Sequence, residues 1–205
     1  MVGFVKMFTF EELVVKWQDL FYYQADARIR DKPLMGSPLP CLIICLSYLF
    51  VIKWLLPKWM EDRKPFYTRK ALWLCNFWHL IASAYFFYRA SIVAWLKYNW
   101  RCEPLDTSTS PEAMAVVELC WQFFLFKFSY MMESVIHVLG KRYELVTKYH
   151  IVHHFTLPMT VWFITNYLPG GHATFFGWIN PGEFIWKFSE IKSFKLSTPS
   201  QQVFT

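Results

Sequence analysis

Three histidines, His150, His153 and His154, form the string HIVHH. On a helix, positions i, i+3 and i+4 share a face, so we expect the three imidazoles to converge. Imidazole titrates near neutral pH, and such a cluster could supply a nucleophile, an acid/base pair or metal ligands. A lone histidine is usually a structural residue, but three beside an apolar run are costly without a use. The spacing therefore predicts a reactive site.

Two further segments carry polar faces that could complete this site. At 100° per residue, one face within roughly a 120° arc is made by five side chains: Lys127, Tyr130, Glu133, Ser134 and His137. Asn76, His79 and Ser83 share an arc of about 60° on another segment. Polar residues in apolar segments normally face inward, so we expect the three faces to meet. The alternative for the Asn76 face is a purely structural role between helices.

The elements that position these residues are long apolar runs. The chain is 55% hydrophobic and 21% aromatic, with 11 Trp and 11 Tyr, which exceeds the usual composition of soluble domains. Residues 38–56, 71–95, 113–139 and 150–167 form runs near the length of about 20 residues needed to cross a bilayer. A soluble protein with a large aromatic core is the alternative. We predict an all-α polytopic membrane bundle with four complete spans, the last kinked at Pro158, and a partial fifth.

The charges between these runs predict the topology. The loops at 57–70, which contains Lys64, and at 140–149 are basic, so the positive-inside rule makes both cytosolic. Residues 1–37 would then be a lumenal segment, 38–180 the transmembrane domain and 181–205 a polar tail unable to span. The net charge is +6, but the basic residues lie between the apolar runs and form no basic face. We therefore expect no nucleic-acid partner. The five cysteines form no CxxC pair, and no bound metal or cofactor is expected.

Four strings carry a resemblance to a known family: KPLMGSPLPCLIICLSYLFVIKWLLPKWMEDRKPF, KFSYMMES, HIVHH and YLPGGHATFFGWIN. Over roughly residues 20–180 the chain resembles the very-long-chain fatty-acid elongases, in their insect-like form. The resemblance implies a multi-pass endoplasmic-reticulum protein whose spans enclose a tunnel for the acyl chain. It also implies a 3-oxoacyl-CoA synthase that condenses long-chain acyl-CoA with malonyl-CoA and releases CO2. The implied partners are these two substrates, the bilayer, other elongases and enzymes of the elongation cycle.

The family's motifs fall on the residues already singled out. Its HxxHH box corresponds to His150, His153 and His154, one of which would accept the acyl group. Its KxxExxDT pattern reads KFSYMMES here: the lysine is kept, Tyr130 replaces the first carboxylate, Glu133 the aspartate and Ser134 the threonine. The resemblance thus implies catalytic roles for the box, Lys127 and Glu133. It implies substrate binding by Asn76, Tyr130, Ser134, His137 and Lys64, although Lys64 also fits a topology-setting loop.

The resemblance stops near Asn180, so we expect a chain without the family's last spans and with little condensing activity alone. A second hypothesis is a non-catalytic chain that pairs with full-length elongases. A third is a membrane desaturase or hydroxylase, since these enzymes also use HxxHH boxes around a di-iron site. They need several boxes, whereas only His79, His137 and His172 remain outside this one.

Overall fold

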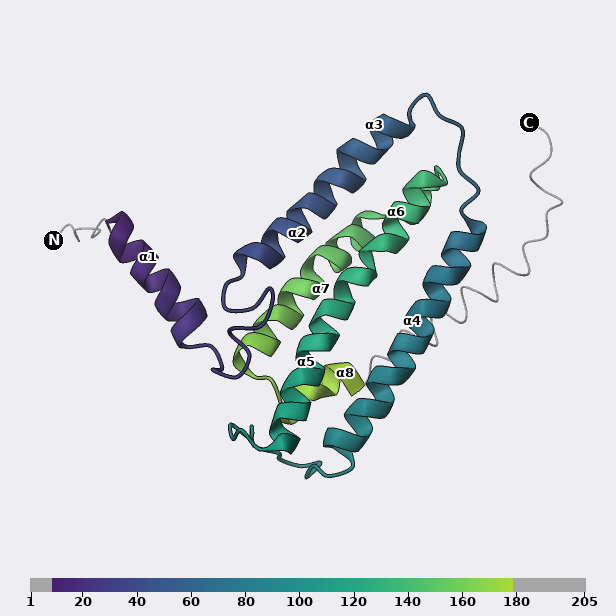
Figure 1. Ribbon diagram of the computed structural model, residues 1–205. Helices are drawn as coiled ribbons and strands as arrows, with labels where there is room; N and C mark the ends of the chain where they lie inside the picture. The colour runs from purple at the N-terminus through teal and green to yellow at the C-terminus, as the bar shows by residue number, and fades with distance from the viewer. Residues whose placement is uncertain (1–8, 179–205) are drawn as a thin grey trace.

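The computed structural model describes residues 9–178, and every regular element in that range is helical (Figure 1). The α-helices are α1 (Phe10–Gln18), α2 (Leu39–Phe50), α3 (Leu56–Met60), α4 (Arg69–Ala90), α5 (Pro111–Ser129), α6 (Met131–Leu139), α7 (Lys148–Tyr167) and α8 (Phe175–Trp178). The π-helical turns are Asp19–Tyr23, Val51–Leu55 and Ser91–Trp95, and the 3-10 turns are Tyr143–Leu145 and Gly171–Thr174. The all-α prediction is confirmed for this range. The expected polar tail and the end of the partial fifth segment lie outside it.

The first apolar run forms one continuous helix, Leu39–Met60, through α2, the π turn and α3. Its 22 residues extend about 33 Å at 1.5 Å per residue, enough to cross a hydrocarbon core of about 30 Å. Among the described residues it is the one helix long and apolar enough to span by length and composition alone. The other long helices carry too much polar character for this criterion, so the number of spans stays a prediction.

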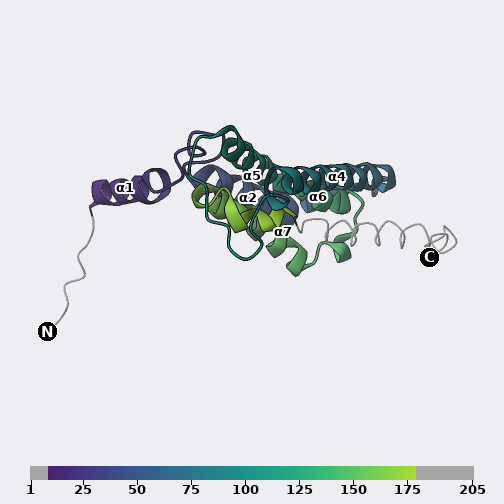
Figure 2. The same ribbon diagram turned by 90° about the horizontal axis from the view of Figure 1, so that it is seen from below.

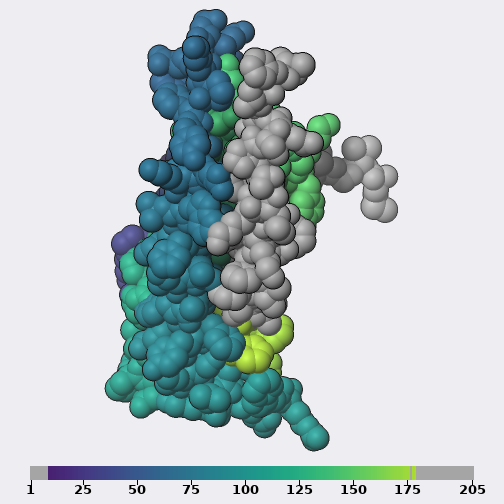
Figure 3. All heavy atoms as spheres, turned by 90° about the vertical axis from the view of Figure 1, so that its right-hand side faces the viewer, coloured from purple at the N-terminus to yellow at the C-terminus, as the bar shows by residue number. Residues whose placement is uncertain are grey.

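The long helices pack side by side as a bundle (Figures 1 and 2). α7 packs against α2 and α5, and α4 packs against α5, α6 and α8. Figure 3 shows the face formed by α4, with α8 beside its lower end. Large apolar side chains such as Phe124 and Trp162 are fully buried between the helices. The indole N–H of Trp162 donates to the Leu34 carbonyl at 2.8 Å, which fixes the loop before α2 on α7.

The two basic loops lie at the same end of the bundle, as expected for loops on one side of a membrane. The Phe66 N–H donates to the Leu139 carbonyl at 3.0 Å, and the Lys141 ammonium donates to the Glu61 carbonyl at 3.2 Å. These bonds join the α3–α4 loop to the α6–α7 connection. The structure therefore places the two loops at one end of the bundle, while their cytosolic location stays a proposal.

At the opposite end, Arg28 holds two loop segments together. Its guanidinium pairs with the Asp26 carboxylate at 2.6 Å and donates to the carbonyls of Asp106 and Ser108 at 2.7 and 2.9 Å. Burial raises the pKa of Asp26, but its hydrogen bonds with Arg28 outweigh this effect, so the pKa lies below its ordinary value. The loop before α2 and the loop before α5 are thereby held as one surface.

The third apolar run differs from its prediction, because residues 113–139 form two helices rather than one. α5 ends at Ser129 and α6 begins at Met131. The Ser129 hydroxyl donates to the Phe126 carbonyl at 2.7 Å. A serine hydroxyl that bonds a carbonyl of the preceding turn competes with the helical ladder and often bends a helix. The break falls within the polar face, next to Tyr130.

The second and fourth runs match their predicted helices closely. The second is helical over α4 and its π turn, from Arg69 to Trp95. The fourth, α7, begins two residues before the predicted start because the Thr147 hydroxyl accepts the His150 N–H at 3.1 Å, an N-cap contact. α7 continues through Pro158. The expected kink at this proline stays a prediction.

Candidate functional site

The first turns of α7 place the three box histidines in different surroundings. His154 is buried, with 8% of its surface exposed, His150 is half-buried, and His153 is exposed. The ring of His154 lies 4.3 Å from that of His150 and 5.4 Å from that of His153, measured between centroids. The His153 ring also pairs with Tyr149, at 6.1 Å. The imidazoles are thus close together as predicted, but only His150 and His154 turn toward the bundle.

A chain of hydroxyl groups connects α2 and α6 to the first box histidine. The Tyr48 and Ser134 hydroxyls lie 2.8 Å apart, and the Ser134 hydroxyl lies 2.8 Å from Nε2 of His150. Ser134 is fully buried and Tyr48 nearly so. Groups bonded this tightly in the interior fix one another's orientation. Ser134 therefore orients His150, and Tyr48 orients Ser134.

The α5–α6 break is held by a histidine of α4. Because the Ser129 hydroxyl hydrogen is used on a carbonyl, Ser129 must accept from Nε2 of His79, 3.1 Å away. His79 therefore carries its proton on Nε2, and Nδ1 faces the Cys75 thiol at 3.9 Å. The His79 ring stacks on Tyr130 with centroids 4.2 Å apart and planes at 11°. Tyr130 lies in turn 6.4 Å from the His154 ring, nearly parallel to it.

The two charged residues of the polar face are both buried. The Lys127 ammonium lies 4.6 Å from the centroid of the Phe123 ring and 5.0 Å from that of Tyr130, which places a cation over aromatic faces. Glu133 lies one turn before His137, with Oε1 3.8 Å from Nε2. Nδ1 of His137 is buried without a hydrogen-bond partner. Both side chains of this face are thus held inside the bundle, on either side of the α5–α6 break.

The remaining predicted site residues lie farther out. Asn76 is half-buried on α4, one turn before His79. Lys64 is exposed in the α3–α4 loop. The structure thus brings together ring and hydroxyl groups from α2, α4, α6 and α7, and leaves Lys64 at the solvent-facing end. Within residues 9–178, no group of three or more His, Cys, Asp or Glu side chains is placed to hold a metal ion.

Three residues of the site were absent from the predicted set. His79 had a signal, because it shares the face of Asn76, but it was not given a role. Ser129 lies within the string KFSYMMES, at a position that the family pattern leaves open. Tyr48 lies in an otherwise apolar run and has no periodicity that marks it. Only the packing of α2 on α7, beside α6, shows its contact with Ser134.

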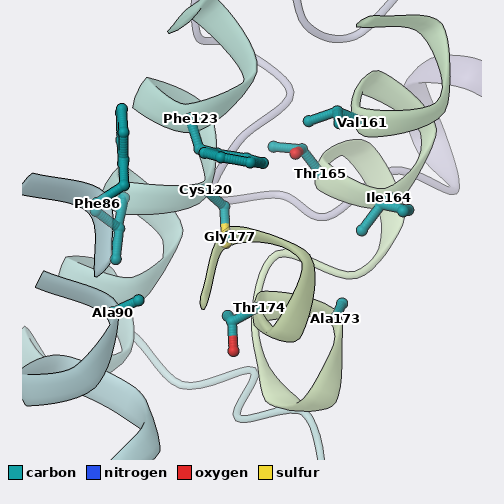
Figure 4. A pocket seen from close by; sticks show the side chains of 11 residues that line it. Phe86, Ala90, Cys120, Phe123, Val161, Ile164, Thr165, Ala173, Thr174 and Gly177 are labelled. Atoms are coloured by element: carbon teal, nitrogen blue, oxygen red, sulfur yellow. The ribbon is translucent and has the colours of Figure 1, made fainter. Parts of the chain in front are cut away.

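An apolar cavity of about 40 Å³ lies farther along the same bundle (Figure 4). α4, α5, α7 and the segment of α8 line it, with side chains that include Phe86, Phe123, Val161 and Thr165. Thr165 lies 11 residues after His154, about 16 Å along a helix. The polar site and the apolar cavity therefore share α4, α5 and α7.

Buried imidazoles, hydroxyls and a lysine between apolar helices define a helical bundle with an internal polar site. The chain belongs to the ELO family, described as GNS1/SUR4, which matches residues 33–186. It is 44% identical over 165 residues to very long chain fatty acid elongase 7 of Drosophila melanogaster, covering 80% of this chain and 50% of that protein. It is 41% identical over 170 residues to very long chain fatty acid elongase 1 of Mus musculus, covering 82% and 61%. The chain thus spans half to three fifths of these curated relatives, whose family acts in fatty-acid elongation.

Proposed function

We propose that this chain acts as a 3-oxoacyl-CoA synthase, condensing a long-chain acyl-CoA with malonyl-CoA. The observation that carries the proposal is that His154 and Lys127 are both buried and both contact the ring of Tyr130, within the family's matched region. Both substrates are anionic CoA thioesters, which suits a site whose α7 histidines lie at the end with two basic loops. Lys64 would attract the CoA phosphates from that surface.

The proposed reaction has two steps. First, a box imidazole attacks the thioester carbonyl of acyl-CoA; the C–S bond breaks, CoA leaves as the thiol, and an acyl-imidazole remains. Second, malonyl-CoA loses CO2, and the resulting enolate carbon attacks the acyl carbonyl. The C–N bond breaks, the departing imidazole takes up a proton from solvent, and 3-oxoacyl-CoA is released. The enolate needs a positive or hydrogen-bonding partner as it forms, and we assign this role to Lys127, which is buried with its ammonium over the Tyr130 ring.

The other residues have supporting roles in this proposal. Ser134 orients His150 through their 2.8 Å contact. Glu133 lies with Oε1 3.8 Å from Nε2 of His137 and would help to hold that ring in place. Tyr130 packs between His79 and His154 and shapes the substrate path together with Asn76. The apolar cavity beyond them would receive the distal part of the acyl chain, because its lining is almost entirely hydrocarbon.

We expect low condensing activity from this chain alone. His153 is exposed within the described part of the chain, so an acyl group carried there would lack the cover that the bundle gives His154. The proposed setting is the endoplasmic-reticulum membrane, with the basic loops cytosolic and the N-terminus lumenal. Other elongases and enzymes of the elongation cycle are the proposed protein partners.

The test separates the two steps. Purified chain in nanodiscs is given a panel of acyl-CoA substrates, first without malonyl-CoA, and intact mass is measured for an added acyl group. Radiolabelled malonyl-CoA is then added, and labelled 3-oxoacyl-CoA is counted. We expect acylation of the wild type, its loss when all three box histidines become Gln, and its retention in His172→Gln, whose histidine bonds the Glu103 N–H in the loop before α5.

The outcomes discriminate between the hypotheses. Acylation that persists in the triple box variant, or that never forms with any acyl-CoA, overturns the proposed role of the box. If condensation rises only when a full-length elongase is added, and the triple box variant stimulates equally, the non-catalytic pairing role is the better account.

A further inference from the structure

The N-terminal helix α1 stands apart from the bundle. In both ribbon views it projects sideways from the packed helices (Figures 1 and 2). None of its residues from Phe10 to Gln18 is buried. It is nevertheless a well-capped helix: the Thr9 hydroxyl accepts the Glu12 N–H, and the Glu12 carboxylate accepts the Thr9 N–H. A stable helix with no protein cover needs another environment for its apolar side chains.

Those side chains form a stripe. At 100° per residue, Phe10, Leu13, Val14 and Trp17 lie within about a 100° arc, and the following turn continues it with Leu20 and Phe21. The opposite side carries Glu11, Glu12, Lys16, Gln18 and Asp19, together with one apolar residue, Val15. Every member of the stripe within α1 is exposed. The helix is therefore amphipathic, with its apolar side uncovered by any described part of the chain.

The position of the helix is fixed by its C-terminal end. The Tyr167 hydroxyl donates to the Leu20 carbonyl at 2.8 Å, and the Asn166 side-chain amide donates to the Phe21 carbonyl at 3.3 Å. The Phe21 ring lies 6.1 Å from that of Trp162 and 6.5 Å from that of Phe163. All these partners lie in the last turns of α7. α1 therefore leaves the bundle at the level where α7 ends, and its stripe continues onto the exposed Phe163.

We propose that α1 lies in the interface of the bilayer as an amphipathic anchor, with lipid covering its apolar stripe. The proposal rests on the bundle spanning a membrane, because the end of a spanning helix marks the interface. A helix with one apolar side, an aromatic residue such as Trp17 in it and a charged opposite side is suited to that depth. The leaflet is the one at the α7 C-terminal end, which the predicted topology assigns to the lumen.

The charges of this helix specify the kind of lipid surface. α1 and its π turn carry three acidic residues, Glu11, Glu12 and Asp19, and one basic residue, Lys16. Attraction to anionic headgroups therefore cannot hold it, unlike the basic interfacial helices that depend on such lipids. Apolar contact must supply the binding. We expect the anchor to persist in zwitterionic membranes and to gain nothing from added anionic lipid.

The experiment places a photo-crosslinking residue, p-benzoylphenylalanine, at single positions of the full chain in phosphatidylcholine nanodiscs. Leu13 probes the apolar stripe, and Val15 is the matched control: both are aliphatic, they are 52% and 63% exposed, and they lie on opposite sides of α1. Ile43, 61% exposed on α2, reports whether the bundle lies in the bilayer at all. After irradiation, mass spectrometry distinguishes lipid adducts from cross-linked dimers.

We expect lipid adducts at positions 13 and 43, in severalfold greater yield than at 15, and unchanged when a fifth of the lipid is anionic. Lipid adducts at 43 but not at 13 overturn the anchor, and dimer adducts at 13 assign the stripe to a second copy of the chain. Equal yields at 13 and 15 also overturn it. If position 43 yields no lipid adduct, the bundle does not lie in the bilayer, and the proposal loses its basis. None of these readouts depends on catalysis.

Discussion

Replacing Tyr48 and Ser134 separately and together tests the hydroxyl chain that reaches His150. Tyr48→Phe keeps the ring and removes one hydroxyl that lies 2.8 Å from Ser134. A buried neutral hydrogen bond contributes a net stability of about 1 kcal/mol, so the free energy of unfolding should fall by about that amount. Ser134→Ala removes a fully buried hydroxyl that has two close partners, the Tyr48 hydroxyl and Nε2 of His150. Each partner then loses a hydrogen bond inside the bundle, at about 1 to 2 kcal/mol apiece, which gives a loss of about 3 kcal/mol.

The double variant should be more stable than Ser134→Ala alone. Once Tyr48 has become Phe, the second change no longer strands a phenol hydroxyl, so the double variant should lose about 2 kcal/mol rather than the additive 4. Unfolding is measured by SDS titration in mixed micelles with circular dichroism. Tyr85→Phe is the matched control, because the Tyr85 hydroxyl bonds Gln122 at 3.3 Å on the surface and its loss should change stability by less than about 0.5 kcal/mol. Additive losses in the double variant, or a loss from Tyr48→Phe no larger than that of the control, would refute the coupling.

Other changes test the frame around the site. Arg28→Ala should lower the free energy of unfolding by about 3 kcal/mol, because it leaves the buried Asp26 carboxylate without its cation. The folded pKa of Asp26 is depressed, so its contribution to stability is present above the unfolded pKa of about 3.9 and is lost as the pH falls through the folded pKa. The free energy of unfolding measured from pH 7 to 3 should therefore fall with pH in the wild type, and Arg28→Ala should lack the part of this fall that comes from Asp26. Gly36 has φ +73°, and in Gly36→Ala the new Cβ would lie 2.5 Å from a backbone carbonyl oxygen, so the free energy of unfolding should fall by more than about 2 kcal/mol. Gly177→Ala is the control: its Cβ would meet nothing nearer than 4.0 Å, and the same denaturation should show a change of less than about 1 kcal/mol. His79→Gln keeps an N–H donor at the position of Nε2, whereas His79→Asn is too short to do so, so the Gln variant should be about 1 kcal/mol more stable. Equal stabilities of the two variants would contradict the assignment of the His79 proton to Nε2.

The long helices could be predicted from the sequence because local signals define them. Apolar runs give their extent, and Ser110 before Pro111, like Thr147 before α7, marks a helix start. Helix α1 was missed although Thr9 and Glu12 have capping-box spacing, because its charges interrupt the apolar pattern. The α5–α6 break could not be predicted, since it depends on Ser129 meeting both a carbonyl and the ring of His79 on another helix.

The sequence predicts which residues of the site share a helical face, but it does not predict which side chains contact one another. Spacing placed His150 and His154 together, and it placed Lys127 and Ser134 on a face that the structure buries. It could not predict that His153 would be exposed, because positions i+3 and i+4 of one helical face lie 100° apart and a neighbouring helix need cover only one of them. The exposure of a residue on a shared face is set by packing.

Tyr130 stands where the family pattern has a carboxylate, and the structure shows how a ring is accommodated there. A carboxylate would orient an imidazole by charge and by accepting its proton. Tyr130 instead lies between the rings of His79 and His154, at 4.2 and 6.4 Å, and so orients by stacking. Because His79 donates Nε2–H to Ser129, the outer ring of this stack is fixed by the helix break itself. His79 of α4 and His154 of α7 thus both contact the Tyr130 ring, and a carboxylate restored at position 130 would bury an added negative charge against His79 in place of the ring stack.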